Sequence, residues 1–390
     1  MDNLNTRDSA LNLLKKFINN GLSNYSSDRN YDYGPQNRTN TSNLSPFIKR
    51  RIIHEAEVIK ECLNYFKYSK IEKFIQEVFW RTYWKGWLEG RPKVWDNYKK
   101  DIKSLKESHS SGIKKKIYLS AIEGTTGIDC YDFWVKELID YGYLHNHSRM
   151  WMSSIWVHTL NLPWQLGADF FLNNLLDADP ASNTLSWRWV TGIHTRGKSY
   201  LASEQNINKY TQNRFIKKKN LSKKSVIPNF EDFIFEKKRF TENLKFSKED
   251  ILLINSNYLN YSLESIEFCK NFKVCLLENS SNNESNRIVK KFSKKSVEDY
   301  LLQLKKKSVH VETFENEKDF LKFLFKNKVK NVYSFYSGIG RQHDILIKLA
   351  KNNNLKLYFK YDQFDKLCWP YASSGFFKFK KEIPRFIGNI

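Results

Sequence analysis

The sequence lacks the features that usually mark membrane, secreted and metal-binding proteins. No apolar run approaches the roughly 18 residues that cross a bilayer, and the N-terminal stretch MDNLNTRDSALNLLKK does not have the order of a secretory signal. The five cysteines form no CxxC pair and no cluster with histidine, which argues against zinc, iron–sulfur and disulfide frameworks. We therefore expect a cytoplasmic protein with no membrane span and no metal site.

Basic residues, by contrast, are abundant. The 390 residues include 65 Lys and Arg against 42 Asp and Glu, a net charge of +23. Such an excess favours a polyanionic partner such as nucleic acid. Much of it is Lys beside Asn and Ile, which can also reflect an AT-rich genome. Charge alone leaves these two explanations open.

Tryptophan is unevenly distributed along the chain. Ten of the 11 tryptophans lie before residue 215, and only Trp369 lies after it. So many indoles in one region can fill a core, surround a planar cofactor, stack on bases or carry electrons. For any single tryptophan, a place in the core is the better explanation.

The hydrophobic pattern divides the chain into two parts. Residues 1–212 show apolar residues at helical spacing and no strand signals, which predicts an all-α domain. Ser45-Pro46 is expected to cap and open one long helix over 45–66. A basic stretch without a clear period, 213–245, predicts a linker.

Residues 246–390 show a different pattern. Short apolar or β-branched runs alternate with amphipathic helical stretches, which predicts an α/β doubly wound domain with a parallel, Rossmann-like sheet. The expected strands are 251–255, 273–278, 309–314, 331–336 and 355–360.

Four polar motifs in the first half are candidates for ligand binding. Thr41, Ser42 and Ser45 can hold phosphate before a helix, although ordinary helix capping is the simpler explanation. Glu77, Trp80, Arg81 and Trp84 share one helix face, where Glu77 and Arg81 must pair or meet a ligand. His145–Met150 is polar at a helix start, and Asp177–Asn183 is an acidic turn; neither has enough spaced ligands for zinc or calcium.

The order and spacing of these motifs resemble those of the FAD-binding helical domain of the cryptochrome/DNA photolyase family. The similarity runs over residues 31–200 through TSNLS (41–45), EVFWR (77–81), EGTTGIDCYD (123–132), HNHSRM (145–150), Trp164 and DADPASNTLSWRW (177–189). The segment FWRTYWKGWLEGRP is closer to divergent bacterial members than to the best-known photolyases.

The resemblance implies FAD as the cofactor and assigns residues to it. The loop Thr41, Ser42, Asn43, Leu44 and Ser45 would hold the diphosphate, and Tyr31 or Tyr33 would open this loop. The flavin pocket would be formed by Arg81, Arg149, Asn146, Asp177, Asp179 and Asn183, with Asn183 facing flavin N5.

The same resemblance implies a pocket for a flipped cyclobutane pyrimidine dimer in UV-damaged DNA. Glu77 would hydrogen-bond the dimer, Trp80 and Trp189 would stack on it, and Asn146 and Met150 would contact its edge. Enzymes for the (6-4) photoproduct carry histidines at the last two positions, so the cyclobutane dimer is preferred.

Two positions depart from the family pattern. His147 stands where an arginine often contacts DNA phosphate, which suggests weaker duplex binding and leaves single-stranded DNA open. In the family's electron-transfer chain, Trp187 and Trp164 match two members, but the third position falls near Ser111. Trp134, Trp151 and Trp156 are alternative electron donors.

Residues 334–386 resemble the end of the family's α/β antenna domain, which normally precedes the flavin domain. The sequence therefore suggests a circular permutation. Tyr336, Gly338, Gly340 and Arg341 lie at the end of a strand, where an antenna chromophore could bind, although a purely structural sheet is as good an explanation.

Taken together, the sequence predicts a monomeric, light-driven photolyase that uses reduced FAD to split cyclobutane pyrimidine dimers. An alternative is a cryptochrome-like FAD photosensor without repair activity, which would not need the dimer pocket. A non-catalytic nucleic-acid binder would not need Asp177, Asp179 and Asn183.

Overall fold

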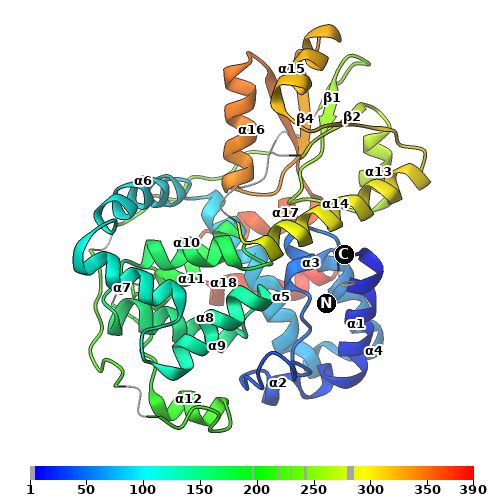
Figure 1. The fold of residues 1–390 in the computed structure, drawn as a ribbon. Helices are drawn as coiled ribbons and strands as arrows, with labels where there is room; N and C mark the ends of the chain where they lie inside the picture. The colour runs from blue at the N-terminus through cyan, green and yellow to red at the C-terminus, as the bar shows by residue number, and fades with distance from the viewer. Residues whose placement is uncertain (1–4, 196, 218–219, 230, 241–243, 279–284) are drawn as a thin grey trace.

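The computed structural model describes residues 5–195, 197–217, 220–229, 231–240, 244–278 and 285–390 (Figure 1). It has the predicted architecture, a helical part followed along the chain by a five-stranded parallel sheet with helices. The helical part comprises α1 (Arg7–Asn20), η1 (Leu22–Asn24), α2 (Tyr25–Asp28), α3 (Ser45–Lys49), α4 (Glu55–Tyr65), α5 (Tyr68–Glu89), α6 (Lys93–Ser108), α7 (Gly112–Glu123), α8 (Asp129–Tyr141), α9 (Asn146–Ser154), η2 (Ile155–Thr159), α10 (Trp164–Asn174), α11 (Pro180–Val190) and α12 (Glu204–Tyr210).

The prediction of one long helix over 45–66 is wrong. The chain forms two helices, α3 and α4, because Arg51 between them adopts a positive φ of 56° that no helix can continue. Ser45 is not a cap either: it is the first residue of α3, and the capping position is held by Leu44. The second helix is capped instead by His54, whose Nδ1 accepts from the Ala56 backbone amide at 3.0 Å.

The second part is a doubly wound α/β unit. Its strands lie in the order β3-β2-β1-β4-β5, all parallel. All five predicted strands are present. The elements are β1 (Ile251–Leu253), α13 (Leu263–Cys269), β2 (Lys273–Leu277), α14 (Arg287–Lys306), β3 (Val311–Phe314), α15 (Glu317–Lys326), β4 (Asn331–Phe335), α16 (Arg341–Asn352), β5 (Lys356–Lys360), α17 (Gln363–Cys368), η4 (Trp369–Tyr371), α18 (Phe376–Lys380) and α19 (Ile383–Ile387).

The segment after β5 leaves the sheet and packs into the helical part. Helices α17, η4 and α18 contact α5, and α19 contacts α4 (Figure 1). At Gly86 of α5, an added Cβ would lie 2.9 Å from the Ala372 Cβ, so glycine permits this close approach. The last residues of the chain therefore help to form the environment of α5.

The segment between the two parts, residues 211–250, contains no helix or strand among its described residues. It is anchored at Gly90, whose carbonyl accepts from the Glu236 amide at 2.8 Å, and at Lys238, which pairs with the buried Glu89. The limits of the predicted linker, 213–245, stay a prediction.

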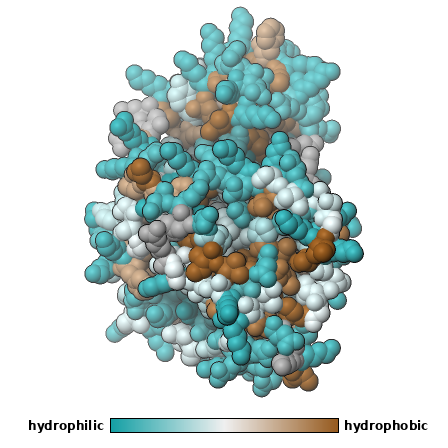
Figure 2. All heavy atoms as spheres, turned by 90° about the vertical axis from the view of Figure 1, so that its left-hand side faces the viewer, coloured by the Kyte–Doolittle hydropathy of each residue, from teal (hydrophilic) through white to brown (hydrophobic). Residues whose placement is uncertain are grey.

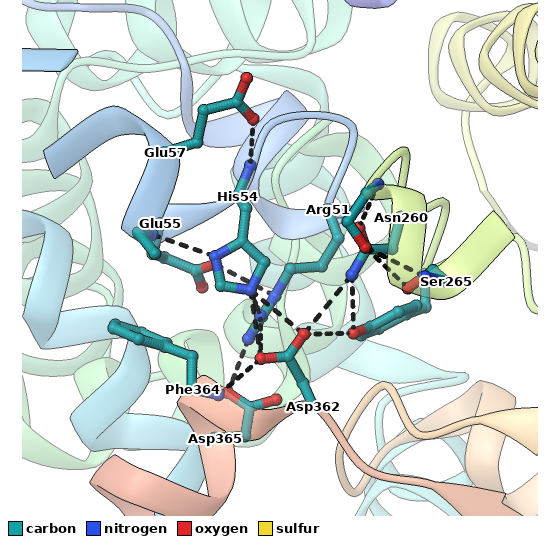
Figure 3. A network of polar contacts seen from close by, with 12 residues as sticks. Arg51, His54, Glu55, Glu57, Asn260, Ser265, Asp362, Phe364 and Asp365 are labelled. Carbon is teal, nitrogen blue, oxygen red and sulfur yellow. Dashed lines mark hydrogen bonds and ion pairs between the residues drawn. The ribbon is translucent and has the colours of Figure 1, made fainter. Parts of the chain in front are cut away.

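A buried ionic network joins the two parts (Figure 3). The Arg51 guanidinium lies 2.6 Å from Asp365 Oδ1, 3.0 Å from Glu55 Oε2 and 3.3 Å from Asp362 Oδ1. These carboxylates belong to α4, to the turn after β5 and to α17. Because the Arg51 and Asp365 side chains are each 1% exposed, solvent screens this attraction little.

Three of the four residues considered for an antenna ligand form domain contacts. Tyr336 donates to the buried Glu89 at 2.8 Å, and Gly340 lies against Pro180, where a Cβ would come within 2.4 Å of Cγ. Arg341 pairs with Asp169 of α10. These contacts favour the purely structural explanation of this edge.

Within the described part of the chain, no helix is long and apolar enough to cross a membrane, and no group of three or more His, Cys, Asp or Glu could hold a metal ion. Figure 2 shows one face of the molecule, where hydrophilic residues cover most of the surface and hydrophobic residues form small separate patches.

The Arg51→Met variant should unfold at lower denaturant concentration. Losing the guanidinium leaves Glu55 and Asp365 as buried, uncompensated carboxylates, which typically costs about 3–5 kcal/mol of unfolding free energy. Urea unfolding followed by circular dichroism measures the difference. As a control, Glu264→Gln removes the partly exposed pair with Lys360, which should change stability by less than about 1 kcal/mol. Equal effects of the two variants would contradict the role given to Arg51.

Candidate functional site

The centre of the candidate site is a bidentate ion pair between α9 and the turn before α11. Arg149 Nη1 and Nη2 each lie 3.0 Å from an oxygen of Asp177. Arg149 Nε also donates to the Leu144 carbonyl at 3.0 Å, which fixes the plane of the guanidinium. The structure thus brings together two residues that are 28 positions apart in the sequence.

A further predicted residue, Arg81, acts on the same carboxylate. Burial alone would raise the pKa of Asp177, but the positive charges of Arg149 and Arg81 hold it below its ordinary value. Asp177 is therefore an anion although it is 4% exposed. Residues Arg81, Arg149 and Asp177, from three separate motifs, therefore act on one another in this structure. That they bind the flavin stays a prediction.

Positive charge is in excess around this point. Lys49, at the end of α3, is close enough to Arg50, Arg81 and Lys85 for their charges to affect it, and Asp179 opposes them. Burial and these like charges lower the pKa of Lys49 well below its ordinary value. Arg81 Nη1 is buried and has no hydrogen-bond partner among the described residues. Buried cations with an unsatisfied donor suit a polyanionic ligand, so the site fits the diphosphate of FAD.

The predicted phosphate loop is a tight turn. Asn43 has a positive φ of 54°, and its side-chain Nδ2 donates to the Arg38 carbonyl at 3.0 Å and to the Thr41 carbonyl at 3.2 Å. Ser42 Oγ accepts from the Leu44 amide at 3.4 Å. Since α3 has only five residues, its dipole is short, and phosphate binding would depend on hydroxyls and the buried cations rather than on a long helix.

Asn183 and Asp179 are held in fixed orientations on α11. Asn183 Nδ2 donates to the Ala168 carbonyl at 2.9 Å, which leaves its Oδ1 as the acceptor for a ligand. Asp179 is the N-cap of α11 and accepts from the Ser182 amide at 2.7 Å. This arrangement is compatible with the predicted position of Asn183 at flavin N5.

Glu77 has a partner that the sequence analysis missed. The predicted alternative was a pair with Arg81, four residues along α5, but Glu77 pairs with Arg29, just after α2. The two side chains are 32% and 30% exposed. The Arg29 carbonyl lies 3.0 Å from His145 Nε2, so this pair borders the start of α9.

The aromatic residues of the predicted dimer pocket have intramolecular partners. The Trp80 ring stacks on Phe376 of α18 at 3.6 Å between centroids and 12° between planes. Trp189 stacks on Tyr200 at 5.8 Å. Asn146 Nδ2 lies 3.8 Å from Met150 Sδ, so these two residues are adjacent on α9. Whether all five residues face one ligand stays a prediction.

The structure gives Tyr31 and Tyr33 aromatic surroundings. Their rings lie parallel at 5.8 Å, and Tyr31 also meets Tyr210 edge-on. Tyr25, which the sequence analysis did not consider, is instead close enough to Glu77 and Arg29 for their charges to affect its pKa. The role of Tyr31 in phosphate binding stays a prediction.

His147 does not extend freely toward a partner. Its ring stacks on Tyr210 at 5.4 Å and on Trp151 at 5.3 Å, and its Nδ1 lies 3.0 Å from the Asn30 carbonyl. Of the three alternative electron donors, Trp156 contacts Trp187, whereas Trp134 and Trp151 stack on each other.

Four residues that lie near the predicted site residues could not be singled out from the sequence. Arg29, Lys49, Lys85 and Phe376 are of common types and stand in no motif of spaced polar groups. Only Arg29, inside SSDRN (26–30), lies in a polar cluster that could have been noticed. Phe376 and Trp80 are far apart in the sequence, so no local pattern can indicate their contact.

Comparison with known proteins finds a family model and several relatives that match part of this chain. A family model described as the FAD binding domain of DNA photolyase matches residues 74–254. The deoxyribodipyrimidine photo-lyase of Agrobacterium fabrum is 30% identical over 186 residues, which are 47% of this chain and 37% of that protein. That of Alkalihalophilus pseudofirmus is 28% identical over 195 residues, 50% of this chain and 39% of the relative.

Cryptochrome-1 of Arabidopsis thaliana is 41% identical over 70 residues, which are 18% of this chain and 10% of that protein. Among solved structures, a bacterial class III photolyase from Agrobacterium tumefaciens is 26% identical, with a TM-score of 0.45, covering 53% of this chain and 43% of that one. The chain thus spans less than half the length of the curated photo-lyases it matches.

The free energy of unfolding should fall as the pH is lowered from 6.5 to about 4, where His145 stays neutral in the folded protein. Burial lowers the pKa of this N-cap histidine from 6.5 to about 4. Between these values the unfolded chain binds the proton and the folded chain does not, so folding loses about 3 kcal/mol as the pH falls from 7 to 4. In His145→Asn, whose side chain can cap the helix but cannot titrate, this part of the loss should be absent from pH-dependent urea unfolding. Identical pH profiles would contradict the assignment.

Proposed function

Because this chain belongs to the cryptochrome/DNA photolyase family, we propose that it is a light-driven DNA repair enzyme that splits cyclobutane pyrimidine dimers. Its partner would be UV-damaged DNA, double- or single-stranded, and it would act as a monomer. The antenna-like nature of residues 334–386 and the permuted domain order stay predictions, because the family match covers residues 74–254.

One observation supports the proposal most strongly. The ion pair of Arg149 and Asp177 lies near Arg81, whose Nη1 atom is buried without a partner among the described residues, and beside an excess of positive charge. Like charges held close together away from water cost free energy, which a bound anion would recover. A dinucleotide flavin would supply both the anion and the hydrogen-bond acceptors.

The chain's own residues would bind and orient. Lys49, Arg50 and Arg81 would neutralise the diphosphate, and the Asp177 carboxylate, held by Arg149, would accept from ligand N–H or hydroxyl groups. Asn183 Oδ1 would accept a hydrogen bond from an N–H group at the flavin edge. When bound and reduced, FAD supplies the photoexcited electron that splits the dimer, so the protein contributes position and electrostatics.

Glu77 and Arg29 would then meet the flipped dimer. A paired carboxylate and guanidinium offer an acceptor and donors to the N–H and carbonyl groups of the two pyrimidines, and Arg29 would favour negative charge that develops on them. Burial raises the pKa of Glu77, while Arg29 opposes this change. Flipping costs a few kcal/mol, part of which aromatic stacking on Trp80 and Trp189 would recover.

A second candidate is a FAD photosensor without repair activity. The observation that favours it is the stacking of Phe376 on Trp80 at 3.6 Å, which covers one face of an indole expected to contact the dimer. If both ring faces were needed for the lesion, the pocket would be closed. Repair by the parent protein separates these two functions.

The deciding experiment is repair of irradiated oligo-dT. Purified protein should release FAD on denaturation and, after chemical reduction, remove dimers under blue light but not in the dark. FAD without light-dependent repair would support the photosensor. A protein that takes up no added FAD would overturn both functions.

Binding to DNA should weaken steeply as salt concentration rises. Contacts between Lys or Arg and phosphates release counterions, and the slope of log affinity against log salt is about −0.7 per phosphate contact on single strands and −0.9 on duplexes. Fluorescence anisotropy with irradiated and undamaged oligonucleotides measures both slopes. If affinity does not change with salt concentration, the +23 charge reflects an AT-rich genome rather than DNA binding.

Glu77→Gln should reduce repair per bound FAD by about 10²–10³, the loss typical of a preorganised electrostatic contact. FAD content should stay unchanged, because Glu77 pairs with Arg29 rather than with residues of the flavin pocket. Glu72→Gln, five residues earlier on α5 and 3.4 Å from Lys380, is the matched control and should repair normally. An unchanged yield in Glu77→Gln would remove Glu77 from the dimer pocket.

A further inference from the structure

The electron-transfer chain expected from the sequence lacks its third tryptophan, and the structure shows where the rings continue. From Trp187, the ring of Trp156 lies 6.1 Å away at 85°. From Trp156, the ring of Tyr118 on α7 lies 6.1 Å away at 87°. Trp156 is fully buried, whereas Tyr118 is partly exposed, so this series of rings leads from the interior toward solvent.

A second series starts at Trp164, the other tryptophan that the sequence assigned to the chain. Trp164 stacks on Tyr98 at 5.8 Å, and Tyr98 stacks on Trp95 at 5.1 Å. These three rings are 4%, 3% and 1% exposed. The series therefore remains inside the protein, where a soluble reductant has little access.

Local electrostatics also distinguishes the two series, because a ring that gives up an electron becomes positively charged. Trp156 Nε1 donates to the Pro163 carbonyl at 2.9 Å, which stabilises that charge. Trp164 has the Arg188 guanidinium 5.9 Å from its ring centroid, and this permanent cation disfavours a second positive charge there. Trp187 Nε1 is buried with no acceptor among the described residues. A positive charge is therefore more stable on the Trp156 ring than on the Trp187 ring.

Gly167 permits the contact between the first two rings. A Cβ at this position would lie 2.2 Å from Trp187 Cη2 and 3.0 Å from Trp156 Cε2. Any larger residue would push at least one indole away. The lack of a side chain at Gly167 of α10 therefore lets the rings of Trp187 and Trp156 approach each other.

We propose that electrons reach oxidised FAD through Trp187, Trp156 and Tyr118, in that order, and that Trp164 is not on the route. This inference rests on the proposed flavin function. Trp187 gives one electron to the light-excited flavin, Trp156 gives one to oxidised Trp187, and Tyr118 gives one to oxidised Trp156. Tyr118 releases its phenolic proton to water, and a soluble thiol then returns one electron and one proton to the tyrosyl radical. The net result is one electron moved from thiol to flavin.

The test is flash photolysis of the FAD-loaded protein, with electron paramagnetic resonance to identify the radical. The parent protein should form a long-lived tyrosyl radical. Trp156→Phe should lose it, whereas Trp164→Phe, the same change at another buried tryptophan, should retain it. In Tyr118→Phe, a tryptophanyl radical should replace the tyrosyl radical. Should Trp156→Phe fail to fold, Tyr118→Phe decides, because its side chain is partly exposed.

Loss of the radical in Trp164→Phe, or a parent-like radical in both Trp156→Phe and Tyr118→Phe, would overturn the route. FAD content and repair by chemically reduced protein are measured on the same samples and should be unchanged in all variants. Normal radical formation without repair would leave the route standing and overturn only the repair function. Protein that binds no FAD would overturn both.

Discussion

The buried guanidinium of Arg51 holds the two halves of the molecule in one arrangement. It sits in a left-handed backbone conformation, unfavourable for a side chain of this size, and faces three carboxylates from both halves of the chain. The ionic contacts stabilise the backbone turn, and the turn in turn ends α3 directly after the candidate phosphate loop. The position of that loop therefore depends on an interaction with the far end of the chain.

The flavin site follows from this arrangement. Short α3 carries Lys49 and Arg50, long α5 carries Arg81 and Lys85, and α9 and α11 contribute the pair of Arg149 and Asp177. These positive charges repel one another, which lowers the stability of the folded protein. A bound anion would reduce the repulsion and so stabilise the fold. FAD binding and folding should for this reason support each other.

The C-terminal segment has two roles in this structure. After β5 it provides Asp365 to Arg51, and it then follows α5 to place Phe376 on Trp80. A segment that belongs to the sheet by sequence order thus completes both the junction between the halves and the surroundings of the expected dimer pocket. Phe376 covers one face of Trp80. Whether the protein repairs DNA or only senses light therefore depends on whether the remaining pocket can hold a dimer.

The sequence by itself determined the two-part architecture and all five strands. These follow from periodicity, which is a local property of the chain. It also drew attention to Arg149 and Asp177, but only the tertiary structure showed that they pair. The sequence could not determine the break at Arg51, because the turn is stabilised by carboxylates more than 300 positions away. The partner of Glu77 and the ring beside Trp187 were likewise decided by tertiary structure. A helix face shows which residues point together, but which element packs against that face depends on the whole fold.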